Sequence, residues 1–444
     1  MKSIGIDLGT TSISVNVVSF PSLTVWGKET LETGGFLESP HSWERAQDPK
    51  SVLFRVRQVL DSLLDQCPDV AAIGLTGQMH GILYVDGEGN ALSPLYTWQD
   101  GRGGLPLSQG KSACQLLGEK GARCAPGYGM GTHLYNLKMG LVPPEAQSFC
   151  TLADWLGMAL TGRERPLLHQ SQAAALGLYN SASCSFQEEI ARSVGMNPAL
   201  FPSVTGELSL QGEYRGVPVS VSLGDNQASF LGSVRRARQT LLVNVGTGAQ
   251  ISLYAERPFQ APGAESRPFL GSSCLLVGST LCGGAAYAAL EGFFREYAVA
   301  AGAPDQPQYD VMARLLAEAP GRPWQVCTAF SGTREDPSAS GSVQGLRRED
   351  LHPAGFIAGV IYGMAQELYG LYQAMKPGAG LPPQKLVASG NGVRRNPFLQ
   401  RALAETFSMP LSLVEAQEEA AFGAALSALG ATGRLSLKER LGIE

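Results

Sequence analysis

The hydrophobic pattern at the start of the chain predicts a β-hairpin. The run from Ile4 to Leu8 is apolar apart from Asp7 and the small Gly5, which is typical of a buried strand. From Ser12 to Val18 polar and apolar residues alternate, and most of the apolar ones are β-branched, which predicts a second strand returning antiparallel to the first. The turn between the strands holds Gly9, Thr10 and Thr11, so it presents hydroxyl and backbone N–H groups.

Strands then alternate with helices. Residues 51–66 have the period of an amphipathic helix, Pro68 breaks it, and residues 70–75 read as a buried strand. Residues 217–221 predict another strand, which leads to Gly224 and Asp225. Residues 101–140 are rich in Gly, Ser and Pro and hold few periodic runs, so we expect an inserted, loop-heavy segment near a site. This rhythm is that of an α/β sheet covered by helices.

The pattern of the opening restarts in the second half. Residues 241–253 again read as strand, Gly-Thr turn and strand, with Gly246, Thr247 and Gly248 in the turn. A chance repeat of Gly-Thr is one explanation, and a duplicated domain that faces its copy across a cleft is the other. The remaining elements that we expect are helices over residues 285–301, 309–319, 354–375 and 398–407, a polar loop over 332–345 and a strand over 385–389 ending in Gly390 and Asn391.

Length and composition favour a two-domain protein that binds small molecules. The 444 residues exceed what one core usually serves, and we divide the chain into residues 1–230 and 231–444. A net charge of −5 without a basic block argues against nucleic acid or an anionic membrane as a partner. The eight scattered cysteines are typical of reduced core thiols, and no secretion or membrane-spanning segment is evident, so we expect a cytoplasmic location. A homodimer is compatible with these features.

The first hairpin suits phosphate binding. Gly9 lets a phosphate oxygen approach the backbone, and Thr10, Thr11 and Ser12 can donate hydrogen bonds to it. Asp7 would repel phosphate unless a hard cation such as Mg²⁺ lay between them. The alternative is an ordinary hairpin with an exposed carboxylate.

Two later segments suit the binding of a polyhydroxylated molecule. Gln78, Met79 and His80 follow a buried strand in a loop flanked by glycines, although His80 could also be a hydrogen-bonded core residue. Residues 97–102 bring Trp98, Asp100 and Arg102 together, which suits a sugar site and equally suits a surface Asp-Arg pair.

Asp225 is the candidate catalytic base. It follows a strand, stands between glycine and the amide of Asn226, and has no cationic neighbour in sequence. The alternative role is that of N-cap for the helix that follows, and both roles are compatible.

In this order along nearly the whole chain, five segments resemble the FGGY family of carbohydrate kinases: GIDLGTT (5–11), GQMHG (77–81), GDNQA (224–228), GTG (246–248) and GNG (390–392). The resemblance implies a two-domain hexokinase/actin-like ATPase fold, ribonuclease H-like, with a cleft between duplicated domains. It also implies transfer of phosphate from ATP, with Mg²⁺, to the terminal hydroxyl of a ketose. The family usually has a run of three glycines where this chain has Gly390, Asn391 and Gly392, so the resemblance does not fix the adenine contacts.

The resemblance implies a role for each motif residue. Asp225 would be the general base, and Asp7 would organise Mg²⁺. The nucleotide would be bound by Thr10, Thr11, Ser12, Gly246, Thr247, Gly248, Gly390 and Asn391. The sugar would be bound by Gln78, Met79, His80, Trp98, Asp100, Arg102 and Asn226.

Within the family, residues 97–102 and 166–180 are most similar to the sedoheptulokinases, which implies sedoheptulose as the acceptor. Xylulokinases usually have Asn where this chain has Gln99, yet Asn226 is closer to the xylulokinases, so D-xylulose stays an alternative. From another class, a non-catalytic sugar-sensing protein of the same fold is a further alternative. A sensor would not need Asp7, Asp225 and both Gly-Thr turns together.

Overall fold

The opening hairpin forms as predicted and lies at the centre of the first sheet. The computed structural model describes residues 1–444 except 108–109, 319–323, 334–335, 337, 417 and 444. In it, β1 (Lys2–Leu8) pairs antiparallel with β2 (Ser12–Ser19) and parallel with β5 (Val70–Gly77). The strand order is β13-β14-β5-β1-β2-β3, with β15 beside β5. The other strands are β3 (Thr24–Glu32), β13 (Leu210–Tyr214), β14 (Val217–Ser220) and β15 (Leu223–Gly224).

Helix α1 (Pro49–Gln66) covers this sheet and begins two residues earlier than its apolar period predicts. Asp48 is the N-cap, and its carboxylate accepts hydrogen bonds from the backbone N–H groups of Lys50 and Ser51. Pro49 takes the first helical position, where its missing N–H costs nothing. Val52 and Leu60 on the inner face are fully buried.

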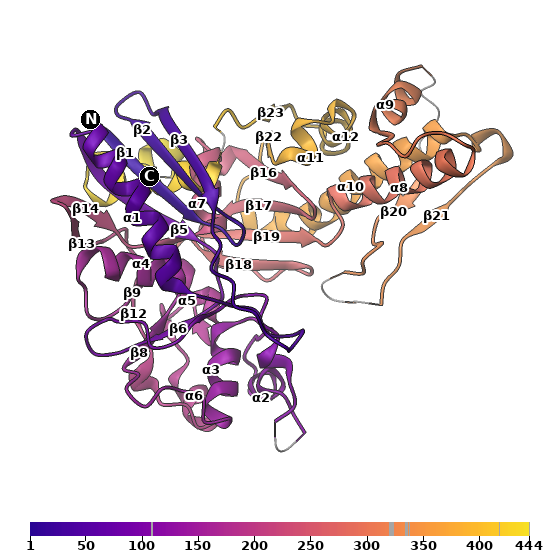
Figure 1. Ribbon diagram of the computed structural model, residues 1–444. Coiled ribbons are helices and arrows are strands. Elements are labelled where there is room, and N and C mark those ends of the chain that lie inside the picture. Colours follow the sequence, from indigo (N-terminus) through magenta and orange to yellow (C-terminus); the bar gives the residue numbers. More distant parts are fainter. Residues whose placement is uncertain (108–109, 319–323, 334–335, 337, 417, 444) are drawn as a thin grey trace.

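The expectation of a loop-heavy segment over residues 101–140 is wrong in part. This segment contains η1 (Arg102–Gly104), α2 (Ala113–Gly118) and α3 (Gly129–Lys138). Helix α2 has only six residues, and the first eight residues of α3 are all buried, so neither helix has a one-sided apolar stripe that a periodicity search could find. Figure 1 shows α2, α3 and α6 gathered below the first sheet.

The rest of the N-terminal half completes this lower part. Its helices are α4 (Leu152–Thr161), α5 (Gln170–Leu176), α6 (Glu188–Ser193), η2 (Pro198–Leu200) and α7 (Asp225–Ser233). Its short strand pairs are β4 (Ala46–Gln47) with β7 (Leu95–Tyr96), β6 (Leu83–Val85) with β8 (Ser148–Cys150), β9 (Leu167–His169) with β12 (Ser203–Thr205), and β10 (Tyr179–Asn180) with β11 (Ser185–Phe186).

The second half repeats the sheet pattern of the first. Strand β16 (Thr240–Val245) pairs antiparallel with β17 (Ala249–Ala255) and parallel with β22 (Lys385–Ser389), just as β1 pairs with β2 and β5. The order is β18-β19-β17-β16-β22-β23, with β18 (Ala264–Pro268), β19 (Cys274–Thr280) and β23 (Leu411–Leu413). This shared arrangement is what a duplicated domain predicts.

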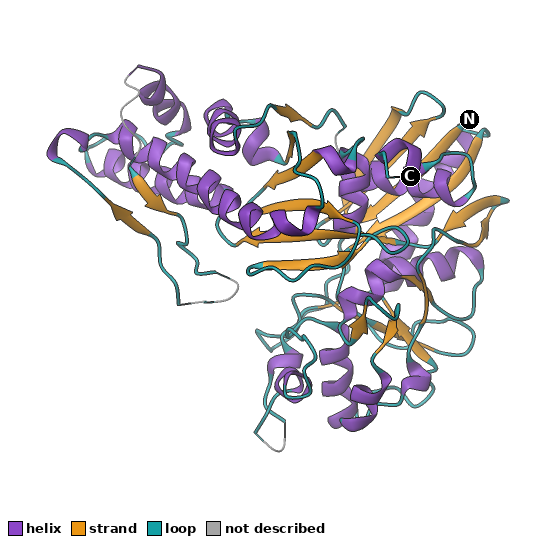
Figure 2. Cartoon of the chain, turned by 180° about the vertical axis from the view of Figure 1, so that it is seen from behind, coloured by secondary structure: helices purple, strands orange, loops and turns teal. Residues whose placement is uncertain are grey.

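Helices pack around the second sheet, and α8, α9 and α10 reach beyond it on the side away from the first sheet (Figures 1 and 2). Helices α8, α9, α10 and α12 agree with the predicted ranges to within a residue or two, although residue 319 of the predicted 309–319 helix lies outside the described residues. The predicted loop 332–345, of which residues 334–335 and 337 are likewise outside, contains the strand β21 (Ser342–Gln344), paired with β20 (Gln325–Cys327). The helices are η3 (Ala237–Gln239), α8 (Gly284–Ala300), α9 (Tyr309–Glu318), η4 (Arg348–Asp350), α10 (Pro353–Met375), η5 (Lys376–Ala379), α11 (Asn391–Arg394), α12 (Pro397–Phe407), α13 (Glu419–Ala431) and α14 (Leu437–Leu441).

Two helices join the halves. Helix α13 comes from the C-terminal end of the chain but packs on β1 and β5 of the first sheet, and it crosses α7 closely. A Cβ atom on Gly423 of α13 would lie 1.8 Å from the backbone oxygen of Ala228 in α7, and one on Gly74 of β5 would lie 1.8 Å from that of Ala424. Glycine is therefore required at these crossings. The division that we predict after residue 230 falls inside α7, and it stays a prediction.

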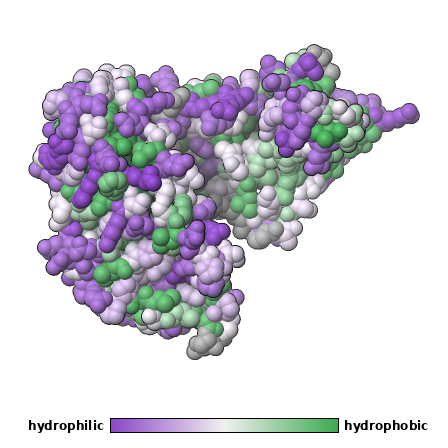
Figure 3. Space-filling model, in the orientation of Figure 1, coloured by the Kyte–Doolittle hydropathy of each residue, from purple (hydrophilic) through white to green (hydrophobic). Residues whose placement is uncertain are grey.

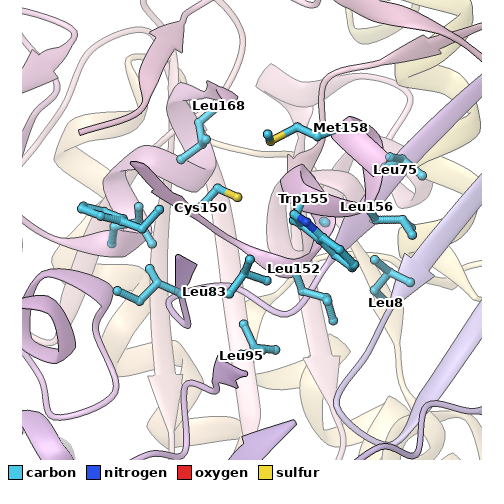
Figure 4. Packing of buried hydrophobic residues seen from close by; sticks show 14 of the residues in the cluster. Leu8, Leu75, Leu83, Leu95, Cys150, Leu152, Trp155, Leu156, Met158 and Leu168 are labelled. Carbon is cyan, nitrogen blue, oxygen red and sulfur yellow. The ribbon is translucent and has the colours of Figure 1, made fainter. Parts of the chain in front are cut away.

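Three hydrophobic clusters stabilise the molecule, one in each half and one around α7 and α13. Figure 4 shows part of the first, where Leu8 and Leu75 of the sheet lie near Trp155 and Leu156 of α4. All eight cysteines are free thiols. The expectation that they lie in the core is wrong for four of them: Cys114 and Cys124 are half-buried, and Cys184 and Cys327 are exposed. In the part of the chain that the structure describes, no helix has the length and apolar character to span a bilayer.

Candidate active site

The predicted catalytic residues gather in one cavity between the two sheets. This cleft cavity has a volume of about 440 Å³, and the space-filling view shows a hollow between the two halves of the molecule (Figure 3). Eight predicted site residues line it, all from the N-terminal half: Asp7, Thr10, Gln78, Met79, His80, Trp98, Asp225 and Asn226. The C-terminal half contributes Leu242, Asn244, Gln250, Ser252, Arg267 and Ala420.

Asp7 lies at the end of β1 with one carboxylate oxygen, Oδ1, buried and without a hydrogen-bond partner among the described residues. Burial, together with the negative charges of Asp225 and Glu418, raises the pKa of Asp7 to about 7. A divalent cation would satisfy Oδ1 and offset the repulsion between these carboxylates. Magnesium is usually held by one or two carboxylates with water and phosphate, so Asp7 fits such a cation.

Asp225 is the first residue of α7, and Gly224 occupies the N-cap position that we considered for it. The Asp225 carboxylate accepts a hydrogen bond from the backbone N–H of Asn226 at 2.6 Å. Burial raises the pKa of Asp225, while the positive charge of Arg267 and the Asn226 N–H act in the opposite direction. A carboxylate with a raised pKa is a stronger base than a solvated one, which suits proton abstraction near neutral pH.

Hydrogen bonds fix the loops on the sugar side of the cleft. His80 has a φ of +75°, which is unusual for a residue other than glycine, and its Nδ1–H donates to the backbone oxygen of Ala175 at 2.7 Å. Its ring stacks on Tyr128 at 4.5 Å between centroids. Trp98 is 46% exposed, and its Nε1–H donates to the hydroxyl of Thr10 at 2.9 Å, joining the predicted sugar and phosphate loops.

The expectation that Asp100 and Arg102 line the sugar pocket is wrong. Asp100 is 0% and Arg102 2% exposed, and the Arg102 Nε donates to the Asp100 carboxylate at 2.7 Å. Arg102 also pairs with Glu44 and lies 3.9 Å from the ring centroid of Tyr96. Their charges are satisfied inside the protein, so this pair shapes the segment that carries Trp98 and does not reach a ligand. The surface ion pair that we kept as the alternative is wrong as well, because this ion pair is buried.

The predicted nucleotide residues of the second half lie side by side. A Cβ atom on Gly390, which has a φ of +90°, would lie 2.4 Å from the backbone oxygen of Val245, so the turn after β22 lies directly on the end of β16. The turn Gly246–Gly248 is exposed or half-buried and rests on the N-terminus of α8, where the Ala285 N–H donates to the Thr247 oxygen. Asn391 begins the short helix α11 and is exposed.

In the first hairpin, hydrogen bonds from Thr33, which follows β3, hold the turn. The Thr33 hydroxyl donates to the Gly9 oxygen, and the Thr33 N–H donates to the Thr11 oxygen. Thr10 lines the cleft cavity, whereas Thr11 lines a neighbouring depression and Ser12 opens β2. Of the three residues, Thr10 alone therefore lines the cleft cavity.

Among the polar residues of the cleft that the sequence reasoning missed are Asn244, Gln250 and Arg267. Asn244 interrupts the apolar run of β16 and donates to the Ser389 hydroxyl, and Gln250 accepts a hydrogen bond from Asn226 at 2.7 Å across the two halves. A polar residue inside a buried strand is a signal that could have found both. Arg267 follows no motif, and only the fold brings it to Asp225.

Comparison with known proteins identifies the family. Models of the FGGY family of carbohydrate kinases match the chain twice, with the N-terminal domain at residues 3–122 and the C-terminal domain at residues 241–432. The chain belongs to the FGGY family of carbohydrate kinases. As an FGGY kinase it is an ATP-dependent sugar kinase with the two-domain actin-like ATPase fold, as the motifs predicted.

Individual relatives include more than one substrate type. The FGGY kinase is 26% identical to a sedoheptulokinase from Mus musculus over 96% of each chain. It is 24% identical to a xylulose kinase from Streptomyces coelicolor over 88% of this chain and 82% of that one. The solved structure of a xylulose kinase from Rhodospirillum rubrum matches with a TM-score of 0.83 at 19% identity, covering 100% of this chain and 92% of that chain.

Proposed function

We propose that this FGGY kinase phosphorylates the terminal hydroxyl of sedoheptulose to give sedoheptulose 7-phosphate. One observation carries the site assignment: Asp7 Oδ1, Gln78 Oε1 and Asn226 Oδ1 are buried in residues that line one cavity and lack hydrogen-bond partners among the described residues. Buried polar atoms are normally satisfied, so these three indicate ligands that complete the site. A cation suits the carboxylate oxygen, and sugar hydroxyls suit the two amide oxygens.

The proposed chemistry starts at Asp225. A sugar hydroxyl is a weak nucleophile until it loses its proton, and the Asp225 carboxylate would accept that proton as the oxygen bonds to the γ-phosphorus of ATP and the bond to ADP breaks. Gln78, His80, Trp98 and Asn226 would orient the sugar, since positioning supplies much of the rate in phosphoryl transfer.

We infer that Asp7 would hold Mg²⁺, directly or through water. When bound, Mg²⁺ neutralises phosphate charge. The two Gly-Thr turns would donate backbone and hydroxyl hydrogen bonds to the phosphates from opposite sides of the cleft, with Thr10 and Thr11 on one side and Thr247 on the other.

The choice of sedoheptulose is supported by the sedoheptulokinase relatives, which match 96% of their own length and 96% of this chain. A xylulose kinase activity is the second candidate, because Asn226 follows the xylulokinase pattern and xylulose kinases are among the relatives and the structural neighbours. Both candidates share the same base and the same reaction.

A coupled assay of ATP consumption across a ketose panel tests the proposal. We expect turnover that depends on ketose and is highest with sedoheptulose. Higher kcat/KM with D-xylulose would make the second candidate correct. Consumption of ATP that no ketose increases would contradict both and favour the sugar-sensing alternative.

The variant Asp225→Asn tests the base. It keeps the size and the half-buried position of the side chain, so we expect kcat to fall by about 10²–10⁴-fold. Nucleotide affinity, measured by titration with a non-hydrolysable ATP analogue, should change little, because Asp225 faces the sugar. Turnover near that of the wild type would show that another group accepts the proton.

A further inference from the structure

A second cavity of about 280 Å³ adjoins the cleft and has no role in the mechanism above. The two cavities share Met79, His80 and Arg267, so they meet at these side chains. We call the second cavity the side pocket. Its other lining residues are Gly121, Arg123, Tyr128, Ser171, Ala174, Ala175, Gly177, Leu178, Tyr179, Ser181, Gln187, Glu265 and Ser266.

The side pocket is built from both halves of the chain. One wall is α5 with the segment that follows it to Tyr179, and another is the loop from Gly121 to Tyr128. A third wall is β18, which carries Glu265 and Arg267. His80 stands at the junction with the cleft, where the hydrogen bond to Ala175 ties its ring to the α5 wall. This arrangement leaves the pocket continuous with the cleft that holds Asp225.

Two ion pairs that share Glu265 lie in the wall of the side pocket. The Glu265 carboxylate accepts hydrogen bonds from Arg123 Nη2 at 2.5 Å and from Arg267 Nε at 3.1 Å. Glu265 and Arg267 are each only 15% exposed, so both are held in place at the pocket wall. A guanidinium carries five N–H donors, and Nε supplies only one of them, so Arg267 keeps donors for a ligand at the junction.

We propose that the side pocket holds the carbons of the acceptor sugar that lie farthest from the phosphorylated hydroxyl. Arg267 then donates hydrogen bonds to hydroxyls of the acceptor at the junction. These contacts select ketoses of six or seven carbons over shorter ones. This inference rests on the proposed function. A ketose that presents its terminal hydroxyl to Asp225 must direct the rest of its chain away from the phosphate turns, and the side pocket is the cavity that meets the cleft at His80 and Arg267. The ring of Tyr128, stacked on His80, offers an apolar face for sugar C–H groups.

The charge balance favours a neutral polyol over a sugar acid. Two carboxylates, those of Glu265 and Asp225, lie close enough to Arg267 for their charges to interact. An acceptor carboxylate would therefore meet two carboxylates as well as the arginines. Hydroxyl groups can accept from Arg267 and donate to Glu265, so they match the wall without adding charge.

Two variants test the inference, with the ratio of kcat/KM for sedoheptulose to that for D-xylulose as the readout. Ala174→Leu places a larger side chain in the side pocket, and Arg267→Gln removes the guanidinium at the junction. We expect each to lower the ratio by about tenfold or more, since a site that hydrogen-bonds hydroxyls discriminates strongly when a partner is lost. Arg238→Gln, at a surface ion pair with Glu256, and Ala300→Leu, at the exposed end of α8, are the matched controls.

The outcomes separate this inference from the proposed function. If the wild type phosphorylates no ketose, the proposed function fails. If the wild type phosphorylates ketoses but both variants leave the ratio unchanged, only the inference fails. An equal loss of kcat/KM for both sugars would show that Arg267 or Ala174 acts on the fold or on the base, which would also overturn the inference. A preference of the wild type for a sugar acid such as gluconate would overturn the assignment of a neutral polyol. If Ala174→Leu does not fold, Arg267→Gln alone decides.

Discussion

At the scale of single residues, the cleft concentrates negative charge. The negative charges of Asp225 and Glu418 lie close enough to Asp7 to raise its pKa, and Asp7 has a buried oxygen without a partner among the described residues. Burying like charges together lowers stability in the absence of a cation. The protein therefore keeps at Asp7 a group that suits ligand binding at the expense of the unliganded fold.

The variant Asp7→Asn tests this trade-off. The pKa of Asp7 is about 7 in the folded protein and about 4 in the unfolded chain. As the pH rises from about 4 to about 7, the unfolded chain therefore loses its proton more readily than the folded protein does, and the free energy of unfolding decreases. The full cost persists at higher pH. With EDTA and without nucleotide, we expect Asp7→Asn to melt about 2–5 °C above the wild type at pH 8. The difference should shrink towards pH 5, where the wild-type carboxyl is protonated.

Thermal melts of both proteins between pH 5 and pH 8 measure this difference. A melting-temperature gap that stays constant over that range would mean that the charge of Asp7 is not what lowers stability. Kinase activity should be lost in Asp7→Asn at every pH, since the amide oxygen is a weak ligand for Mg²⁺ compared with a carboxylate.

The sequence identifies a site residue when the residues next to it along the chain form a recognisable pattern. Asp7 ends a strand just before a glycine turn, and His80 and Asp225 closely follow strands, so the pattern itself marks them. Arg267 was missed because only the packing of β18 brings it to the cleft. Asp100 and Arg102 were misassigned because composition cannot tell a buried ion pair from a binding pair.

At the scale of elements, the crossing of α7 and α13 holds the two halves at a fixed spacing. Glycines let the backbones approach where Gly423 meets Ala228 and where Gly232 meets Glu419. Any larger residue would meet a backbone oxygen, which cannot move aside as a flexible side chain can.

The variant Gly423→Ala tests that contact. Its Cβ would lie 1.8 Å from the Ala228 oxygen, so the helices must separate, and we expect a loss of about 1–3 kcal/mol in the free energy of unfolding. Gly370→Ala in α10 is the control, because its Cβ would meet nothing within 4 Å and alanine favours a helix by about 0.5–1 kcal/mol over glycine. Urea denaturation measures both. Equal stabilities of the two variants would contradict the tight crossing.

Elements with a clear period were predictable, and buried or short ones were not. The two hairpins, α1 and α10 follow from alternation or from an apolar stripe. The first eight residues of α3 are all buried, and both Gly129 and Gly131 lie in it, so its sequence resembles a loop. Only tertiary packing makes it a helix.

At the scale of the whole molecule, the predicted ligand residues are divided between the two halves, and the predicted nucleotide residues Thr10, Thr11 and Ser12 lie in the N-terminal half with the predicted sugar residues. The predicted sugar residues Gln78, His80 and Trp98 belong to the N-terminal half, and the predicted nucleotide residues Gly246–Gly248 and Gly390 belong to the C-terminal half. The duplicated sheets were predictable from the repeated hairpin. The return of α13 onto the first sheet was not, because it depends on contacts more than 400 residues apart in the chain, such as that between Ser3 and Ala425.

This division predicts closure of the cleft around both substrates. The halves are joined along α7 and α13, so they can rotate towards each other about that crossing, and a ligand pair that touches both gains contacts only when they approach. Closure would also exclude water, which otherwise competes with the sugar hydroxyl for the phosphoryl group. We expect the radius of gyration in small-angle X-ray scattering to decrease when sedoheptulose and a non-hydrolysable ATP analogue are present together.

Either ligand alone should produce a smaller decrease, because only the two together supply all the contacts that bridge the halves. Asp225→Asn should close like the wild type, since closure depends on binding and not on proton transfer, and it therefore separates the two events. A radius of gyration that is unchanged by both ligands would mean that the free enzyme already has the closed shape. In that case the side pocket and the cleft would be preformed, and selection of the acceptor would rest on their static shape alone.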